Sequence, residues 1–208
     1  MITHKINPKQ TALLLISFQN DFFASNGVLR RVIEESSRVT NVLANTVDLV
    51  EHLLITPVLI ISTPIIFTED YSELIGKPIG ILKTIKEARA FKRGTKGAEI
   101  VPELRRFGDR IIEVPGRRGF NAFSNTDLNV ILQQRNITNV VLTGAVTSIC
   151  VDPTGRYAFE LGYKVTILSD CTAGRSNIEQ EFYCKEIFPL YAEVMDHLKF
   201  LKCLGVKK

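Results

Sequence analysis

Short apolar runs alternate with longer stretches of helical spacing along most of the chain. The apolar runs cover residues 12–16, 58–61, 111–114, 140–142 and 165–168. Runs this short and continuous are typical of strands that are buried on both faces, as in parallel sheets. Because parallel strands need crossover connections, the alternation predicts an α/β fold in which helices cover both faces of a parallel sheet.

The stretches between the runs carry helix signals of their own. Apolar residues recur at roughly helical spacing over residues 37–54. Thr126 is predicted to cap a helix. A further helix is predicted over about residues 149–161, with Pro153 near its first turn and Gly162 at its end.

Two later segments carry more specific signals. Ser176 and Glu179 have the spacing of a capping box, which predicts a helix to about residue 188. Residues 64–108 show no clear period and include a basic stretch from Lys83 to Lys96. This stretch is typical of a solvated face. Alternatively, it forms a lid that brings a cation to a pocket or attracts an acidic substrate.

Length and composition narrow the class of protein. The 208 residues favour one domain that spans residues 1–208, because a typical domain has about 150 residues. With 45% hydrophobic and 23% charged residues, the chain is neither disordered, nor collagen-like, nor a disulfide miniprotein. The mean hydropathy of +0.11 predicts apolar surface buried in a homo-oligomer. A net charge of +4 is too small for a nucleic-acid partner.

The first apolar run is too short to place the chain in a membrane. It spans about seven residues, against the roughly twenty of a membrane span, and residues 19–21 follow it without a small-residue cleavage site. The cysteines form no Cys-x-x-Cys pair and are expected to be free thiols: Cys150, Cys171, Cys184 and Cys203. We therefore expect a cytoplasmic protein with no membrane partner.

Three candidate site residues follow predicted strands: Ser17, Arg117 and Cys150. Ligands of open α/β sheets bind beyond the carboxyl ends of the strands, so these side chains are expected near a ligand. Cys150 also begins a predicted helix, where the dipole and the unpaired N–H groups lower a thiol pKa and can hold an oxyanion. The alternative interpretation of Cys150 is a small buried packing residue.

Several segments together carry a family resemblance. The sequence from Ala12 to Phe22 reads ALLLISFQNDF, the segment from Gly144 to Val151 reads GAVTSICV, and FSNTDL follows from Phe123. Over most of residues 10–195 the chain resembles the isochorismatase-like cysteine hydrolase superfamily, which includes nicotinamidases, carbamoylsarcosine amidases and ureidoacrylate amidases. The resemblance implies a three-layer doubly wound fold with a mostly parallel sheet of order 3-2-1-4-5-6. It also implies a small-molecule substrate or ligand and no cofactor.

The resemblance also implies a catalytic triad of Asp, Lys and Cys. The cysteine falls on Cys150, the aspartate position on Ser17 and the lysine position on Arg117, with Arg118 as a one-residue alternative. A cis peptide bond is implied just before the nucleophile, between Val146 and Thr147. The backbone N–H groups of Thr147 and Cys150 are then expected to bind the oxyanion.

The two substitutions change what the triad can do. A serine hydroxyl is a poor base near neutral pH, and an arginine does not give up its proton. Full conversion of an ordinary thiol to thiolate gains about 30-fold at pH 7. Loss of a general acid–base costs about 10²–10⁴-fold, which is the larger effect. We therefore expect weak or absent amidase activity unless another group substitutes.

Few other residues are candidates for the site. Asp21 is expected to be structural, with a role as the missing base as the alternative. Aromatic residues at the motif ends are candidates for the pocket wall: Phe18, Phe22, Phe120 and Phe123. No metal site is expected, because His4, His52 and His197 are scattered and the Asp-x-His…His pattern of metal-dependent nicotinamidases is missing.

Three functions remain open at this point. The first is a cysteine hydrolase that cleaves a small amide or related C–N bond through Cys150, with Arg117 and Ser17 in support. The second is a catalytically silent relative that binds a small metabolite or a protein partner. The third is a true isochorismatase, which Ser17 disfavours because that reaction relies on acid catalysis at the aspartate position.

Overall fold

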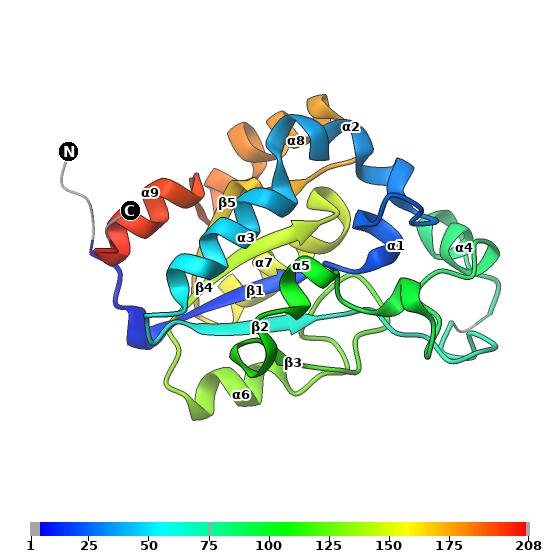
Figure 1. The fold of residues 1–208 in the computed structure, drawn as a ribbon, viewed down its shortest axis with the longest axis horizontal. Helices are drawn as coiled ribbons and strands as arrows, with labels where there is room; N and C mark the ends of the chain where they lie inside the picture. The colour runs from blue at the N-terminus through cyan, green and yellow to red at the C-terminus, as the bar shows by residue number, and fades with distance from the viewer. Residues whose placement is uncertain (1–4, 75, 207–208) are drawn as a thin grey trace.

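Six parallel strands form a sheet at the centre of the molecule (Figure 1). The computed structural model describes residues 5–74 and 76–206. In spatial order the strands are β3 (Ile112–Glu113), β2 (Leu59–Thr63), β1 (Thr11–Ile16), β4 (Asn139–Ala145), β5 (Lys164–Ala173) and β6 (Glu193–Met195). All neighbouring pairs are parallel. The predicted α/β class and the order 3-2-1-4-5-6 are therefore confirmed.

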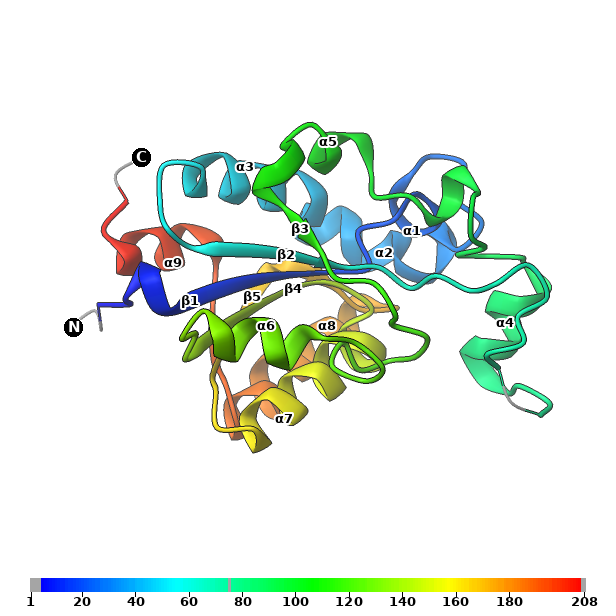
Figure 2. The ribbon, with the colours of Figure 1, turned by 90° about the horizontal axis from the view of Figure 1, so that it is seen from below.

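Helices cover both faces of the sheet (Figure 2). One face packs against α2 (Arg30–Thr40), α3 (Val42–Leu53) and α9 (His197–Leu204), and the other against α6 (Leu128–Gln134) and α7 (Asp152–Glu160). Side chains of β1 alternate between the two layers, and all of them are buried. This explains why the strand sequence is apolar throughout instead of alternating with polar residues.

The remaining elements are short. The further α-helices are α1 (Asn20–Phe23), α4 (Gly80–Glu87), α5 (Pro102–Arg105) and α8 (Asn177–Phe182). The 3₁₀ turns are Pro8–Gln10, Lys96–Ala98, Gly108–Arg110 and Phe188–Leu190, and the π-helical turns are Thr147–Val151 and Tyr183–Ile187. Within residues 5–74 and 76–206, no helix combines the length and the apolar character that crossing a membrane requires.

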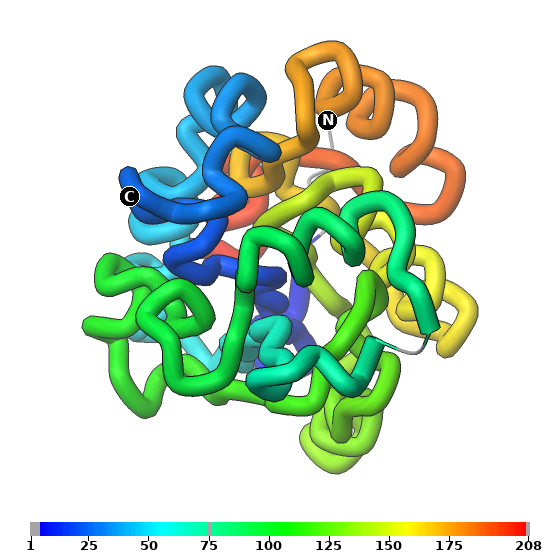
Figure 3. The backbone as a smooth tube through the Cα atoms, turned by 90° about the vertical axis from the view of Figure 1, so that its right-hand side faces the viewer, coloured from blue at the N-terminus to red at the C-terminus, as the bar shows by residue number. Residues whose placement is uncertain are grey.

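The amino and carboxyl ends of the strands have different surroundings. The start of the described chain and α9 lie beyond the amino ends of the strands, whereas α4 lies beyond the carboxyl ends (Figures 1 and 2). In Figure 3 the segments that follow the strands face the viewer. These segments include residues 64–108, whose short elements explain why the sequence shows no period there.

Two predicted helix starts differ from the structure. The hydroxyl of Thr126 donates to the carbonyl of Ala122 at 2.7 Å, and α6 begins two residues later, after Asp127. The helix predicted from residue 149 begins as a π-helical turn at Thr147. By contrast, Ser176 caps α8 as predicted, because its hydroxyl accepts the Glu179 N–H at 3.1 Å.

Candidate active site

The three residues predicted from the strand ends come together in the structure. Ser17 follows β1, Arg117 lies in the segment after β3, and Cys150 follows β4. The side chains of Ser17 and Arg117 are fully buried, and Cys150 is 3% exposed. Parallel strands end at the same edge of the sheet, which is why positions 100 residues apart in the chain meet here.

Arg117 is the centre of this cluster. Its guanidinium donates to four oxygens: Ser17 Oγ at 2.7 Å and the carbonyls of Thr63 at 3.0 Å, Gly119 at 3.1 Å and Phe120 at 3.0 Å. Burial lowers the pKa of Arg117, and its electrostatic and hydrogen-bond interactions with the Cys150 thiol oppose that effect. A guanidinium has five N–H groups, so one N–H remains for Cys150 after these four bonds.

Ser17 holds a strained position in the turn after β1. Its φ is +56°, a conformation that few residues other than glycine adopt readily. Its hydroxyl oxygen accepts from Arg117, so its proton is free to be donated to a ligand. Gln19 secures the turn, because its amide donates to the carbonyls of Ile65 at 2.8 Å and Ala98 at 2.7 Å.

The turn that carries Cys150 differs from the implied geometry in two respects. The cis peptide bond lies between Ala145 and Val146, one bond before the predicted position at Val146–Thr147. The N–H of Cys150 donates to the Val146 carbonyl at 2.7 Å, so it is not available to an oxyanion in this structure. The N–H of Thr147 has no hydrogen-bond partner among the described residues and remains the candidate oxyanion donor.

Two side chains from α8 hold the same turn, and sequence reasoning missed both. The hydroxyl of Thr147 donates to Gln180 Oε1 at 2.5 Å, and the hydroxyl of Ser148 donates to Glu179 Oε1 at 2.6 Å. The Glu179 carboxylate therefore faces the turn before Cys150 in place of completing the capping box. The capping-box pattern identified Glu179 but carried no information about this contact.

A small, partly open cavity lies beside Cys150. Its volume is about 10 Å³, which is room for about one water molecule. Its walls are mostly apolar and include Phe22, Phe67, Phe120, Val146 and Ile149. The predictions of Phe22 and Phe120 as pocket residues agree with this lining.

The other two aromatic candidates do not line this cavity. Phe18 is 1% exposed and stacks on Phe23, with ring centroids 4.9 Å apart. Phe123 packs against Tyr157 and Tyr163, at centroid distances of 5.5 and 6.3 Å. Both rings are buried against other aromatic rings and not against the cavity.

The basic stretch lies partly on a helix that also lines the cavity. Helix α4 places Ile81, Leu82 and Ile85 on the cavity, while Lys83 and Lys86 are exposed. The charges therefore form a solvated face, and the apolar side of the same helix closes the site. The cation that lines the cavity is Arg118, from outside this stretch.

Asp21 has a structural environment. Its Oδ2 accepts the Phe91 N–H at 2.6 Å, and its carboxylate packs against Gly97. Burial raises the pKa of Asp21, against opposing hydrogen bonds from the N–H groups of Phe91 and Val28. Asp21 lines a separate hollow of about 390 Å³ and does not line the Cys150 cavity.

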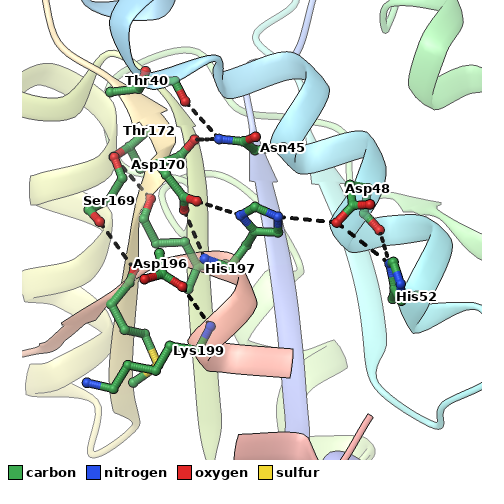
Figure 4. A network of polar contacts seen from close by, with 12 residues as sticks. Thr40, Asn45, Asp48, His52, Ser169, Asp170, Thr172, Asp196, His197 and Lys199 are labelled. Carbon is green, nitrogen blue, oxygen red and sulfur yellow. Dashed lines mark hydrogen bonds and ion pairs between the residues drawn. The ribbon is translucent and has the colours of Figure 1, made fainter. Parts of the chain in front are cut away.

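A second buried polar cluster lies on the α3 and α9 side of the sheet (Figure 4). The Nδ1 of His197 lies 2.5 Å from Asp170 Oδ2, and its Nε2 lies 3.2 Å from Asp48 Oδ2. Asp170, Cys171 and His197 have the residue types of a metal site, with ligand atoms within 4.8 Å of one another. His4 lies outside the described residues. Sequence spacing alone did not reveal this cluster, because its members come from three separate elements.

All four cysteines are free thiols, as expected from their spacing. Burial raises the pKa of the Cys184 thiol to about 11. Burial, with Asp170 nearby, raises the pKa of the Cys171 thiol well above its usual range. Cys150, by contrast, interacts with the buried guanidinium of Arg117.

Comparison with known proteins places this geometry in context. The family model of the isochorismatase domain matches residues 11–198. The uncharacterized isochorismatase family protein YwoC of Bacillus subtilis (strain 168) is 36% identical over 106 residues, which are 50% of this chain and 54% of that protein. The chain thus matches about half the length of this curated relative.

Solved structures share the fold over nearly the whole chain. The cysteine hydrolase from Pseudomonas syringae pv. phaseolicola 1448A has a TM-score of 0.83 at 21% identity and covers 96% of this chain and 94% of its own. The N-carbamoylsarcosine amidase from Thermoplasma acidophilum has a TM-score of 0.70 at 18% identity, with coverages of 90% and 96%.

Proposed function

Because the chain belongs to the isochorismatase family, we propose that it is a hydrolase that cleaves a small amide or a related C–N bond through Cys150. The observation that carries this proposal is the buried guanidinium of Arg117, which faces the Cys150 thiol and is fixed by Ser17 at 2.7 Å. A fixed buried cation favours the thiolate, which is the nucleophilic form of cysteine. The amidase and cysteine hydrolase of the same fold support this choice of chemistry.

The proposed reaction has two steps. The Cys150 thiolate attacks the amide carbon, a C–S bond forms, and the C–N bond breaks as the leaving nitrogen takes a proton from water. The hydroxide left by this proton transfer takes a proton from a second water as that water attacks the thioester. A C–O bond then forms, the C–S bond breaks, and the carboxylic acid leaves with the thiolate restored. Arg117 balances the thiolate charge, Ser17 donates a hydrogen bond, and the Thr147 N–H is the donor for the oxyanion.

The rate of this reaction is expected to be low. No carboxylate is among the described residues that line the Cys150 cavity, so the proton transfers lack a side-chain acid or base. Removing a general acid–base costs about 10²–10⁴-fold in rate. The same gap supports a second candidate function, in which the chain binds a small metabolite without turning it over.

One set of variants separates the two functions. Purified wild type, Cys150→Ala and Ser17→Asp are tested for amine or ammonia release from a panel of small amides. Aspartate tolerates the left-handed backbone at position 17 and pairs with Arg117, so Ser17→Asp is expected to raise the rate at least tenfold. Hydrolysis by wild type that Cys150→Ala lacks supports the hydrolase. No release by wild type or Ser17→Asp, with thermal stabilisation by a panel compound, supports the binding protein.

The assembly state and compartment form part of the same proposal. We expect a cytoplasmic homo-oligomer, which the exposed apolar side chains of Phe159, Ile178 and Phe182 and the free cysteines favour. Sedimentation velocity at micromolar concentration tests the assembly, and a single species of 23.3 kDa would contradict it.

A further inference from the structure

The walls of the Cys150 cavity differ in chemistry from its floor. The floor holds Cys150, with the buried Arg117 behind it and outside the lining, whereas the walls are formed by apolar side chains from α1, from α4 and from the segments after β2, β3 and β4. Among the described residues that line the cavity, Arg118 is the single charged side chain. A polar group on the part of a substrate that these walls surround would lose its water and find no partner.

We propose that the site accepts substrates whose acyl group is apolar and that it disfavours cationic substrates. Helix α4 is the lid that moves to let the apolar substrates enter. This inference rests on the proposed attack by Cys150 and goes beyond it by naming the class of substrate. It assigns the selection to two features: the apolar side of α4, and the positive charge of Arg118 beside the cavity.

The lid assignment follows from the size of the cavity. A volume of about 10 Å³ holds about one water molecule, so an acyl group enters only if a wall moves. Helix α4 supplies three neighbouring side chains of the wall: Ile81, Leu82 and Ile85. Other wall segments are held by hydrogen bonds to distant residues: Phe67 bonds Phe91, and the carbonyls of Gly119 and Phe120 accept from Arg117.

The hydrogen bonds of α4 allow it to move as a unit. Within the described chain, every hydrogen bond and ion pair of residues 80–87 is local, such as Thr84 to Gly80 and Lys83 to Glu87. Apolar contacts alone therefore hold the helix on the cavity. The segment after it is anchored, because Phe67 and Phe91 are joined by a backbone hydrogen bond of 2.8 Å and the Tyr71 hydroxyl donates to Ala90 at 2.8 Å.

Arg118 places a positive charge at the cavity. Its side chain is exposed, it lines the cavity, and it forms no ion pair with a described carboxylate. Together with the buried Arg117, it makes the approach to Cys150 positive. Positive ligands are repelled by such a field, and neutral or negative ones are not.

Thiol labelling tests this selection without requiring turnover. Methanethiosulfonates with a benzyl, a sulfonatoethyl or a trimethylammonioethyl group are reacted separately with the protein. The Cys150 thiolate attacks the sulfenyl sulfur, an S–S bond forms, and methanesulfinate leaves. The rate at Cys150 is measured by peptide mass mapping, with Cys150→Ala as background, and is divided by the rate of the same reagent with glutathione.

The expected order of the normalised rates is benzyl, then sulfonatoethyl, then trimethylammonioethyl, with at least about tenfold between the first and the last. Arg118→Gln is expected to narrow the gap between the two charged reagents at least threefold. Equal normalised rates, or a fastest reaction with the cationic reagent, would overturn the inference.

A matched pair of variants on α4 tests the lid. Leu82 lines the cavity, and its neighbour Lys83 is exposed. Leu82→Ala is expected to speed the benzyl reaction severalfold, whereas Lys83→Ala leaves it unchanged. An equal effect of both variants, or none from Leu82→Ala in a protein with an unchanged melting temperature, contradicts the lid.

The outcomes also separate this inference from the proposed function. Benzyl-selective labelling without any amide hydrolysis retains the apolar site and rejects the hydrolase. Hydrolysis that is fastest with cationic or strongly polar acyl groups retains the hydrolase and rejects the apolar site.

Discussion

Two buried basic side chains in this protein, Arg117 and His197, have opposite electrostatic surroundings. His197 lies between two carboxylates, with its ring nitrogens 2.5 Å from Asp170 and 3.2 Å from Asp48. Arg117 meets carbonyl and hydroxyl oxygens and the Cys150 thiol, but no described carboxylate. The His197 cluster therefore contains two carboxylates, and the Arg117 cluster contains none among the described residues.

This difference separates a structural cluster from a reactive one. A buried charge is costly unless an opposite charge or several hydrogen bonds balance it. Both ring nitrogens of His197 contact carboxylates, so that cluster needs no further partner and joins α9 to β5 and α3. Arg117 is balanced by its four hydrogen bonds without a formal anion, so an anionic group that binds beside it would add the missing opposite charge. Ser17 places a neutral hydroxyl beside Arg117, at a position where the family resemblance leads us to expect an aspartate.

Arg117→Ala is expected to have the largest effect. Four hydrogen bonds from one buried group would be lost, and the Ser17 hydroxyl and three carbonyls would lose their donor. The expected loss in free energy of unfolding is about 4 kcal/mol, measured by urea denaturation. Arg117→Lys keeps the charge and is expected to lose less. Equal losses for both variants would show that the charge contributes nothing at this position.

The next largest expected effect is a difference in labelling rate between the cysteine thiols. Because burial raises the pKa of Cys184 to about 11, against 9.0 for an ordinary thiol, its thiolate is about a hundredfold scarcer near pH 8. Cys150 faces Arg117, so iodoacetamide at pH 8 is expected to label Cys150 before Cys184 and Cys171. Peptide mass mapping over time measures the order. Labelling of Cys184 first would remove the basis for calling the Arg117 cluster reactive.

His197→Ala is expected to weaken the fold without changing the chemistry. Loss of hydrogen bonds to two carboxylates costs about 2 kcal/mol in free energy of unfolding, because both acids remain partly exposed. The normalised rate of Cys150 labelling is expected to stay within twofold of wild type, since His197 and its carboxylate partners do not line the Cys150 cavity. A tenfold drop in that rate would mean that the clusters are coupled.

The sequence predicted the features that depend on local pattern. Buried strands such as β1 and β4 contain short continuous apolar runs, and the strand order followed from the family resemblance. Ser17, Arg117 and Cys150 could be predicted because each directly follows a strand or a motif. The N-cap at Ser176 could be predicted because a capping hydrogen bond spans three residues.

Features that depend on contacts between distant segments could not be predicted in this way. Phe18 and Phe123 have the same residue type and motif position as true wall residues, and packing alone decides which rings face the cavity. Helix α4 is short and has charges on one side, so its role as a wall is visible only when its partners are placed. The Asp48–His197 contact spans 149 residues and has no local pattern.

Asp21→Asn is expected to have the smallest effect on stability. It tests whether Asp21, a third buried ionisable side chain, is structural like the His197 cluster. Burial raises the pKa of Asp21 above its usual 3.8, so the folded state binds this proton more tightly than the unfolded state does. The contribution of Asp21 to stability therefore falls as pH rises from about 3.8 through the folded pKa. Asparagine does not titrate, so the stability of the variant relative to wild type is expected to increase over that range. Urea midpoints between pH 4 and pH 7 measure the trend.

The same variant decides whether Asp21 acts as a base for Cys150. The carboxylate accepts the Phe91 N–H at 2.6 Å, and an asparagine oxygen can accept the same bond. Labelling of Cys150 at pH 8 is therefore expected to be unchanged, because Asp21 does not line its cavity. A hundredfold loss of labelling, with the pH trend in stability intact, would instead make Asp21 the missing base. Arg117 would then have a carboxylate acting with it, and the contrast with His197 would disappear.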